Sequence, residues 1–200
     1  MKRVDFLRKL YLLAFLFITT IVLTACNNEA TIPDQTNWPL EDFSHINQVG
    51  EDFSLTSDVK GEVTVVNMIF TNCSTVCSPM TANMARLQRM AAEQDVNIKF
   101  LSFSVDPEID DPDTLKEFGD MFDADYSNWN FITGYSQKYI EEYAMKNFKA
   151  IVAKPKNDPE VIHGTRMYLV NEEGVVVKNY DGLDVPYEEI LEHAQILLNK

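Results

Sequence analysis

Phe70-Thr71-Asn72-Cys73-Ser74-Thr75-Val76-Cys77-Ser78-Pro79-Met80 is the stretch that decides the fold, because it joins two segments with different hydrophobic periodicity. The run before it, residues 63–70, is apolar and rich in β-branched side chains, which predicts a buried strand. Residues 80–92 repeat apolar side chains at helical spacing. Cys73 and Cys77 therefore lie where a central strand turns into a helix, and this is the edge of an α/β sheet at which sites are built.

The spacing of the two cysteines limits what they can do. In Cys-x-x-x-Cys the thiols stand at i and i+4, one above the other if the segment is helical. Such a pair can share one metal ion or, after a small adjustment, close a disulfide. The helix dipole and the free N–H groups at a helix N-terminus favour the thiolate form. The alternative is a pair of buried structural cysteines, which is the weaker interpretation because two of only three cysteines meet at this edge.

The remaining segments predict one α/β domain. Its expected elements are a strand at 96–105, a helix at 111–122, a short strand or loop at 129–134, a helix at 137–148, a hairpin of 166–170 with 175–180, and a helix at 187–198. This order is that of a thioredoxin-like fold: a central mixed sheet flanked by helices, with an inserted helix and a C-terminal β-hairpin plus helix. In that fold the loop before the hairpin lies against the cysteine motif, and here His163-Gly164 occupies that loop.

The start of the chain predicts a lipoprotein signal peptide. Four basic residues precede an apolar run of fourteen residues, Leu10 to Leu23, which is short for a membrane-spanning helix. The run ends in Leu23-Thr24-Ala25-Cys26, which resembles a bacterial lipobox, so Cys26 is predicted to carry the lipid. The alternative is a plain membrane anchor with a chance cysteine. We expect a signal peptide at 1–25, a tether at 26–42 and the folded domain at 43–200.

Export and charge define the setting of this domain. Residues 1–25 carry a net charge of +3 and the whole chain −14, so the remainder carries −17. No basic stripe is present, which argues against a nucleic-acid partner. An acidic domain is repelled by anionic lipid, so residence at the extracytoplasmic face of the cell membrane depends on the lipid anchor. Outside the cytosol thiols can oxidise, which makes Cys73–Cys77 a candidate redox disulfide as well.

Several motifs together resemble the Sco/SenC family, thioredoxin-fold copper proteins that help to assemble the copper centre of cytochrome c oxidase. The family pattern is Cys-x-x-x-Cys-Pro after a strand that ends in Phe-Thr, and this chain has it with Ser78 inserted before Pro79. Further matching segments are Ser104-Val105-Asp106-Pro107-Glu108, Asp113-Thr114-Leu115-Lys116 and His163-Gly164-Thr165. The resemblance covers residues 43–198 and implies a membrane-anchored protein that acts on subunit II of the oxidase.

The resemblance also implies a copper site made of Cys73, Cys77 and His163. Two thiolates and one imidazole form a soft set of three ligands that suits Cu(I) or Cu(II), whereas a closed structural zinc site would need a fourth ligand. Asp106 is predicted to orient His163 or a thiol as a hydrogen-bond acceptor, and an ordinary turn acid before a proline is the alternative. The other histidines, His45 and His193, are not expected to be ligands, and His193 is expected on a solvent-exposed helix face.

Two functions follow from this site. In the first, the protein delivers copper to cytochrome c oxidase subunit II or keeps the cysteines of that subunit reduced. In the second, it is a thiol–disulfide oxidoreductase that acts through Cys73 and Cys77, with a thioredoxin-like protein as reductant. Thioredoxin-type enzymes use Cys-x-x-Cys together with a cis-proline. This chain has no Cys-x-x-Cys motif, and no proline directly precedes the strand at Met167. Whether the protein is an enzyme is left open by the sequence.

Overall fold

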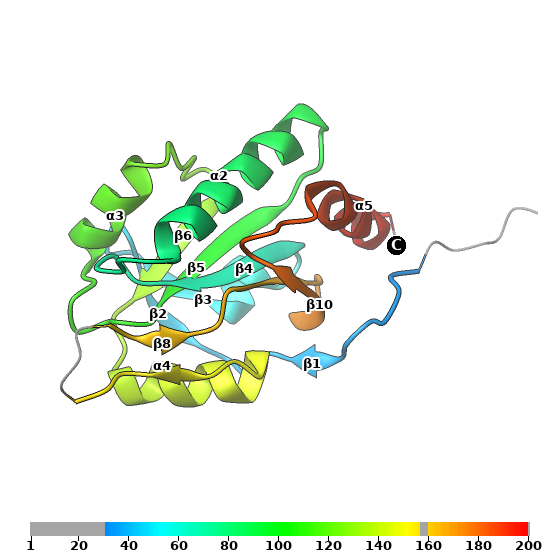
Figure 1. Cartoon of the computed structure of the whole chain (residues 1–200). Coiled ribbons are helices and arrows are strands. Elements are labelled where there is room, and N and C mark those ends of the chain that lie inside the picture. The colour runs from blue at the N-terminus through cyan, green and yellow to red at the C-terminus, as the bar shows by residue number, and fades with distance from the viewer. Residues whose placement is uncertain (1–30, 157–159, 200) are drawn as a thin grey trace, which may run out of the picture. The chain divides into compact units, whose positions relative to one another are not determined.

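The computed structural model describes residues 31–156 and 160–199, and the chain from Ile32 onward forms one unit. An eight-stranded mixed sheet has the strand order β1-β10-β9-β4-β5-β6-β2-β3 (Figure 1). Its strands are β1 (Trp38–Pro39), β2 (Ser44–Asn47), β3 (Asp52–Ser54), β4 (Thr64–Ile69), β5 (Lys99–Ser104), β6 (Trp129–Thr133), β9 (Arg166–Val170) and β10 (Val175–Asp181). A separate two-stranded ribbon pairs β7 (Val152–Ala153) with β8 (Ile162–His163).

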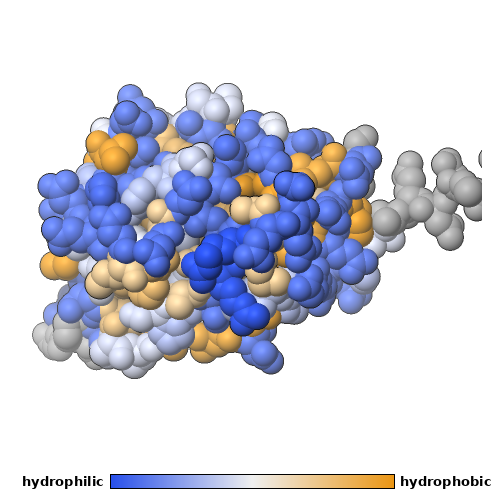
Figure 2. All heavy atoms as spheres, turned by 90° about the horizontal axis from the view of Figure 1, so that it is seen from above, coloured by the Kyte–Doolittle hydropathy of each residue, from blue (hydrophilic) through white to orange (hydrophobic). Residues whose placement is uncertain are grey.

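The helical elements cover both faces of the sheet. They are the π-helical turn η1 (Leu55–Val59), α2 (Cys77–Glu93), α3 (Pro112–Asp120), α4 (Gln137–Tyr143), the π-helical turn η2 (Ala144–Phe148) and α5 (Tyr187–Leu198). In Figure 1, α2 and α5 lie on one side of the sheet and α4 on the other. The outer surface over α2 and α5 is mostly hydrophilic, with small separate apolar patches (Figure 2). This is the predicted α/β thioredoxin-like fold.

Strand β4 is central to the core and sets the position of the cysteines. It pairs in parallel with β5 and antiparallel with β9, and all six of its residues are buried. Parallel strands covered by helices on both faces need nearly continuous apolar sequence, which explains the run at residues 63–70. Each fully buried Val, Ile or Met side chain contributes about 1.5–3 kcal/mol relative to exposure. The buried strand therefore holds its carboxyl end firmly in the core, and the chain runs from there into α2.

Several boundaries differ from those expected from the sequence. Helix α2 begins at Cys77, three residues before the predicted start. Packed structure is present ahead of residue 43: Ile32 and Leu40 are buried, and β1 pairs with β10 as an edge strand of the sheet. The expectation that His193 is solvent-exposed is wrong. Its side chain is buried, and its Nδ1 lies 2.8 Å from the hydroxyl of Tyr180, which satisfies the imidazole inside the core.

The predicted signal peptide and the lipid-bearing Cys26 lie outside the described residues. Within the described ranges, none of the helices combines the length and the apolar character needed to cross a bilayer.

Candidate metal centre

The two cysteines lie at the carboxyl end of β4, where the sequence predicted them. Cys77 is the first residue of α2 and is buried, while Cys73 lies in the preceding turn and is half-buried. No side chain caps the helix from Val76. Instead, the backbone N–H of Cys77 donates to the Cys73 sulfur at 3.3 Å. Because the first N–H groups of a helix have no partner within it, the Cys73 sulfur serves as an acceptor at the helix N-terminus.

The surroundings shift the pKa values of the two thiols in opposite directions. Partial burial raises the pKa of Cys73, but hydrogen bonds from the Cys77 thiol and from the backbone of Thr75, Val76 and Cys77 outweigh it, so the net pKa is lowered. Burial, followed by the hydrogen bond to Cys73, raises the pKa of Cys77 well above its ordinary value. Cys73 is therefore the readier thiolate. The positive charge of a bound metal ion would favour loss of the Cys77 proton.

His163 approaches this pair from β8, a segment that is 86 residues distant from Cys77 in sequence. Its Nε2 lies 3.3 Å from the Cys77 sulfur, and its Nδ1 lies 2.9 Å from the carbonyl oxygen of Gly164. If Nδ1 carries the hydrogen and donates it to that carbonyl, the lone pair of Nε2 points to the cysteines. Burial lowers the pKa of His163, which favours the neutral imidazole that binds metals. Phe70 packs edge-on against the ring.

The three side chains are close enough to bind one ion. One ligand atom from each of Cys73, Cys77 and His163 lies within 4.8 Å of the other two. A metal about 2.3 Å from each sulfur and about 2.0 Å from the nitrogen would hold these atoms about 4 Å apart, so only a small opening of the Cys77–His163 contact is needed. Among the described residues, no other group of three His, Cys, Asp or Glu side chains comes as close. The topology thus brings together the three predicted ligands.

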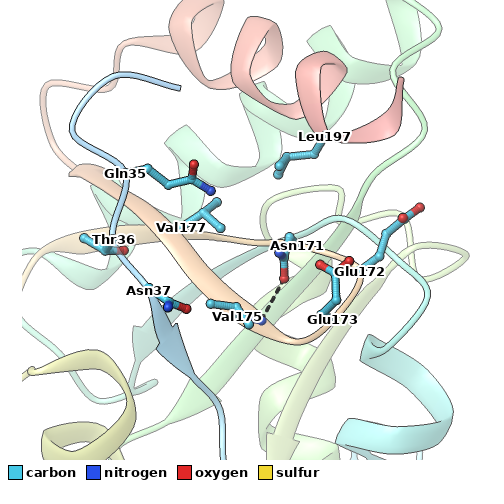
Figure 3. A pocket seen from close by; sticks show the side chains of 9 residues that line it. All are labelled: Gln35, Thr36, Asn37, Asn171, Glu172, Glu173, Val175, Val177 and Leu197. Carbon is cyan, nitrogen blue, oxygen red and sulfur yellow. Dashed lines mark hydrogen bonds between the residues drawn. The ribbon is translucent and has the colours of Figure 1, made fainter. Parts of the chain in front are cut away.

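An open hollow adjoins Cys73 and His163. It measures about 340 Å³ and is lined by Phe70, Cys73, Val76, Ile162 and His163 among others. Cys73 and His163 are therefore accessible from this side, while Cys77 is buried beneath them. A larger hollow of about 570 Å³ lies by the turn between β9 and β10 (Figure 3). Val170, the last residue before that turn, pairs with Thr64 at the start of β4, so the turn lies at the end of the strands opposite to the cysteines. No thiol or imidazole lines this larger hollow.

Asp110 was not predicted and holds the cysteine turn in place. Its fully buried carboxylate accepts hydrogen bonds of 2.6 Å from the hydroxyls of Thr71 and Ser104, and its backbone carbonyl accepts one from Thr133. Burial raises the pKa of this carboxyl group. In the sequence Asp110 stands next to Asp111, whose side chain caps α3. The sequence alone does not show which of these two aspartates is buried and which one caps the helix.

Asp106 is buried, and its carboxylate lies 2.6 Å from the ammonium group of Lys154. Among the described residues, no hydrogen bond joins it to Cys73, Cys77 or His163. Its influence on the site remains a prediction, and its side chain lies against Lys154 and not against a predicted ligand.

The sequence was compared with models of known protein families and with known proteins. Residues 33–199 match the family model described as SCO1/SenC. The chain belongs to the SCO1/SenC family. It is 46% identical over 180 residues to the SCO1 protein homolog of Bacillus subtilis strain 168, and the match covers 90% of each chain.

Solved structures of SCO1/SenC proteins share the fold. A SCO1/SenC family lipoprotein from Bacillus anthracis is 47% identical with a TM-score of 0.81, over 84% of this chain and 99% of that one. BsSco, a member of the Sco family of cytochrome c oxidase assembly proteins that was studied for a disulfide switch, is 44% identical with a TM-score of 0.78, over 84% and 98%. Copper-bound ScoI from Bradyrhizobium japonicum is 22% identical with a TM-score of 0.66, over 80% and 99%, which shows the fold alone.

Proposed function

We propose that this protein binds one copper ion through Cys73, Cys77 and His163 and passes it to the copper centre of cytochrome c oxidase subunit II. The observation that carries the proposal is the meeting of two thiols and a neutral imidazole within 4.8 Å of one another beside an open hollow. It is supported by the family, whose members include an oxidase assembly protein and a ScoI structure with copper bound.

The donor set favours copper over the other common metals. Thiolates suit Cu(I), imidazole also suits Cu(II), and Cu(II) is bound most tightly among the divalent ions of the series. Zinc in a structural site takes four protein ligands, and the described residues offer only three here. The chain's own contribution is to hold the imidazole neutral, to present Cys73 as a ready thiolate and to release the proton of Cys77 when the ion binds.

A second function, thiol–disulfide exchange, is favoured by the contrast between the two thiols. The half-buried Cys73, which is the readier thiolate, can attack a disulfide of a partner protein and form a mixed disulfide while one partner thiolate leaves. Cys77 then gives its proton to the partner thiolate that has left and attacks Cys73, which closes the Cys73–Cys77 disulfide and releases the second partner thiolate. The partner gains two electrons and this chain loses two. A thioredoxin-like reductant would restore the pair, and in this way the protein could keep oxidase cysteines reduced.

The assembly function predicts a specific defect in cells. A strain that lacks this protein should lose most cytochrome c oxidase activity in its membranes, and the wild-type gene should restore it. A gene with Cys73→Ser and Cys77→Ser should not restore it, because both proposed roles need these thiols. Equal amounts of the two proteins in membranes are the control. Normal oxidase activity in the strain without the protein would contradict the function.

We further propose that lipid on Cys26 holds the protein at the extracytoplasmic face of the cell membrane. The lipobox-like sequence at residues 23–26 supports this, as does the relative that is described as a lipoprotein. Cys26→Ser should abolish incorporation of a labelled fatty acid and release the protein from washed membranes, since an acidic domain gains nothing from anionic lipid. Cys73→Ser, which leaves the lipobox intact, should be labelled like the wild type. Equal label on Cys26→Ser would overturn the assignment.

A further inference from the structure

His163 is carried by an element that is not part of the main sheet. The β7–β8 ribbon pairs only with itself, through Val152 opposite His163 and Ala153 opposite Ile162, and it lies beside α4 (Figure 1). A two-stranded ribbon has little stability of its own in water. The position of His163 relative to the cysteines therefore depends on what fastens this ribbon to the rest of the domain.

Lys154, the residue that follows β7, makes one charged attachment of the ribbon, and the carboxylate of Glu160, two residues before β8, makes another by accepting from the backbone N–H of Ser74. The lysine ammonium group lies 2.6 Å from a carboxylate oxygen of Asp106 and 3.0 Å from one of Glu108, and the lysine backbone N–H donates to Glu141 on α4. The side chain of Asp106 is 2% exposed and that of Lys154 21%, so the pair is shielded from water on the acidic side. The hydrogen bond to Asp106 raises the pKa of Lys154, which keeps the amine charged.

The same loop also fastens the cysteine side of the site. The backbone carbonyl of Asp106 accepts hydrogen bonds from Ile109 and Asp110, which ties the two ends of this short loop together. Asp110 in turn binds Thr71, two residues before Cys73. One loop after β5 thus holds the cysteine turn through Asp110 and the histidine ribbon through Asp106.

We propose that the Asp106–Lys154 ion pair positions His163 against Cys77 by fastening the β7–β8 ribbon to the loop that also holds the cysteine turn. Its consequence for copper rests on the proposed function. Removing the pair should leave the two thiols in place and let the imidazole move away. Because the imidazole is the ligand suited to Cu(II), removing the pair should lower the affinity for Cu(II) and leave the affinity for Cu(I) unchanged.

The test uses the full-length protein in detergent and the double variant Asp106→Asn with Lys154→Met. Changing both residues avoids a buried unpaired charge, which could unfold the protein. We expect the Cu(II) dissociation constant to rise by about 10–100-fold, the range for a group that acts on a ligand through another residue. The nitrogen hyperfine structure in the Cu(II) EPR spectrum should be lost, and Cu(I) affinity should be unchanged. Lys154→Arg, which keeps the charge, should retain the nitrogen signal.

The matched control is Lys156→Met, which removes an exposed lysine two residues further along the same loop and should bind Cu(II) like the wild type. A second measurement needs no copper: amide hydrogen exchange in the ribbon of the reduced protein should accelerate in the double variant alone. If the wild type failed to bind copper, the proposed function would fall, and this exchange would still decide whether the pair fastens the ribbon. Unchanged exchange, or faster exchange with an unchanged nitrogen signal and Cu(II) affinity, would overturn the positioning role.

Discussion

Closing the Cys73–Cys77 disulfide should abolish copper binding by this protein. Oxidation removes both thiolates, and His163 alone would remain of the three ligands. The bond is within reach, because the two sulfur atoms lie within 4.8 Å of each other and Cys73 is the readier thiolate. We therefore expect one copper ion per reduced protein and none per oxidised protein.

The measurement is copper stoichiometry after removal of free metal, before oxidation, after oxidation and after treatment with dithiothreitol. Recovery of binding on reduction shows that the oxidised protein has not been damaged. The Cys26→Ser variant should give the same three values, since the proposed site uses only Cys73, Cys77 and His163. Retention of copper by the oxidised form would place the ion elsewhere in the molecule.

His163→Ala should weaken Cu(II) binding by more than about 100-fold, the upper range for residues that act only through a ligand. The two thiolates remain and can still hold Cu(I), so the loss should be confined to Cu(II). The Cys73–Cys77 pair should still oxidise and be reduced by dithiothreitol, because exchange depends on thiolate access and not on an imidazole. The readouts are Cu(II) and Cu(I) titrations together with a thiol count.

The same variant separates the two proposed functions in cells. If the protein passes copper on, His163→Ala should lack oxidase activity, and copper added to the medium should partly restore it. If it acts only as a reductant, oxidase activity should be nearly normal. His45→Phe is the control, because it exchanges one ring for another on β2, where His45 packs against Tyr135 and Tyr139. Full activity of His163→Ala would favour the oxidoreductase role.

The core and the cysteine pair could be predicted because their signals are local. The β-branched run before Cys73 makes a strand wherever it is buried, and the segment after Cys77 repeats at helical spacing. The place of His163 followed from topology, since the loop before a C-terminal hairpin lies against the cysteine motif in a thioredoxin-like fold. Structure and prediction agree here because the position of His163 depends on only a few elements: the central strand, the helix after it and the C-terminal hairpin.

The supports of the site could not be predicted, because they depend on contacts between distant segments. Asp106 and Lys154 are 48 residues apart, and nothing in either neighbourhood marks them as partners. The strands β7 and β8 have two residues each, too few for a periodicity to be recognised. His193 was placed on the wrong face because its acidic neighbours suggested solvent, whereas its actual partner, Tyr180, lies on another element.

The most direct test of the copper site is an anaerobic titration of the reduced full-length protein with Cu(II), followed by visible and EPR spectroscopy. We predict saturation at one ion per chain, with a sulfur-to-copper charge-transfer band and nitrogen hyperfine structure from one imidazole. Both signals should vanish in the Cys73→Ser, Cys77→Ser double variant. Binding that lacks the charge-transfer band, or that survives unchanged in the double variant, would contradict a copper site formed by Cys73, Cys77 and His163.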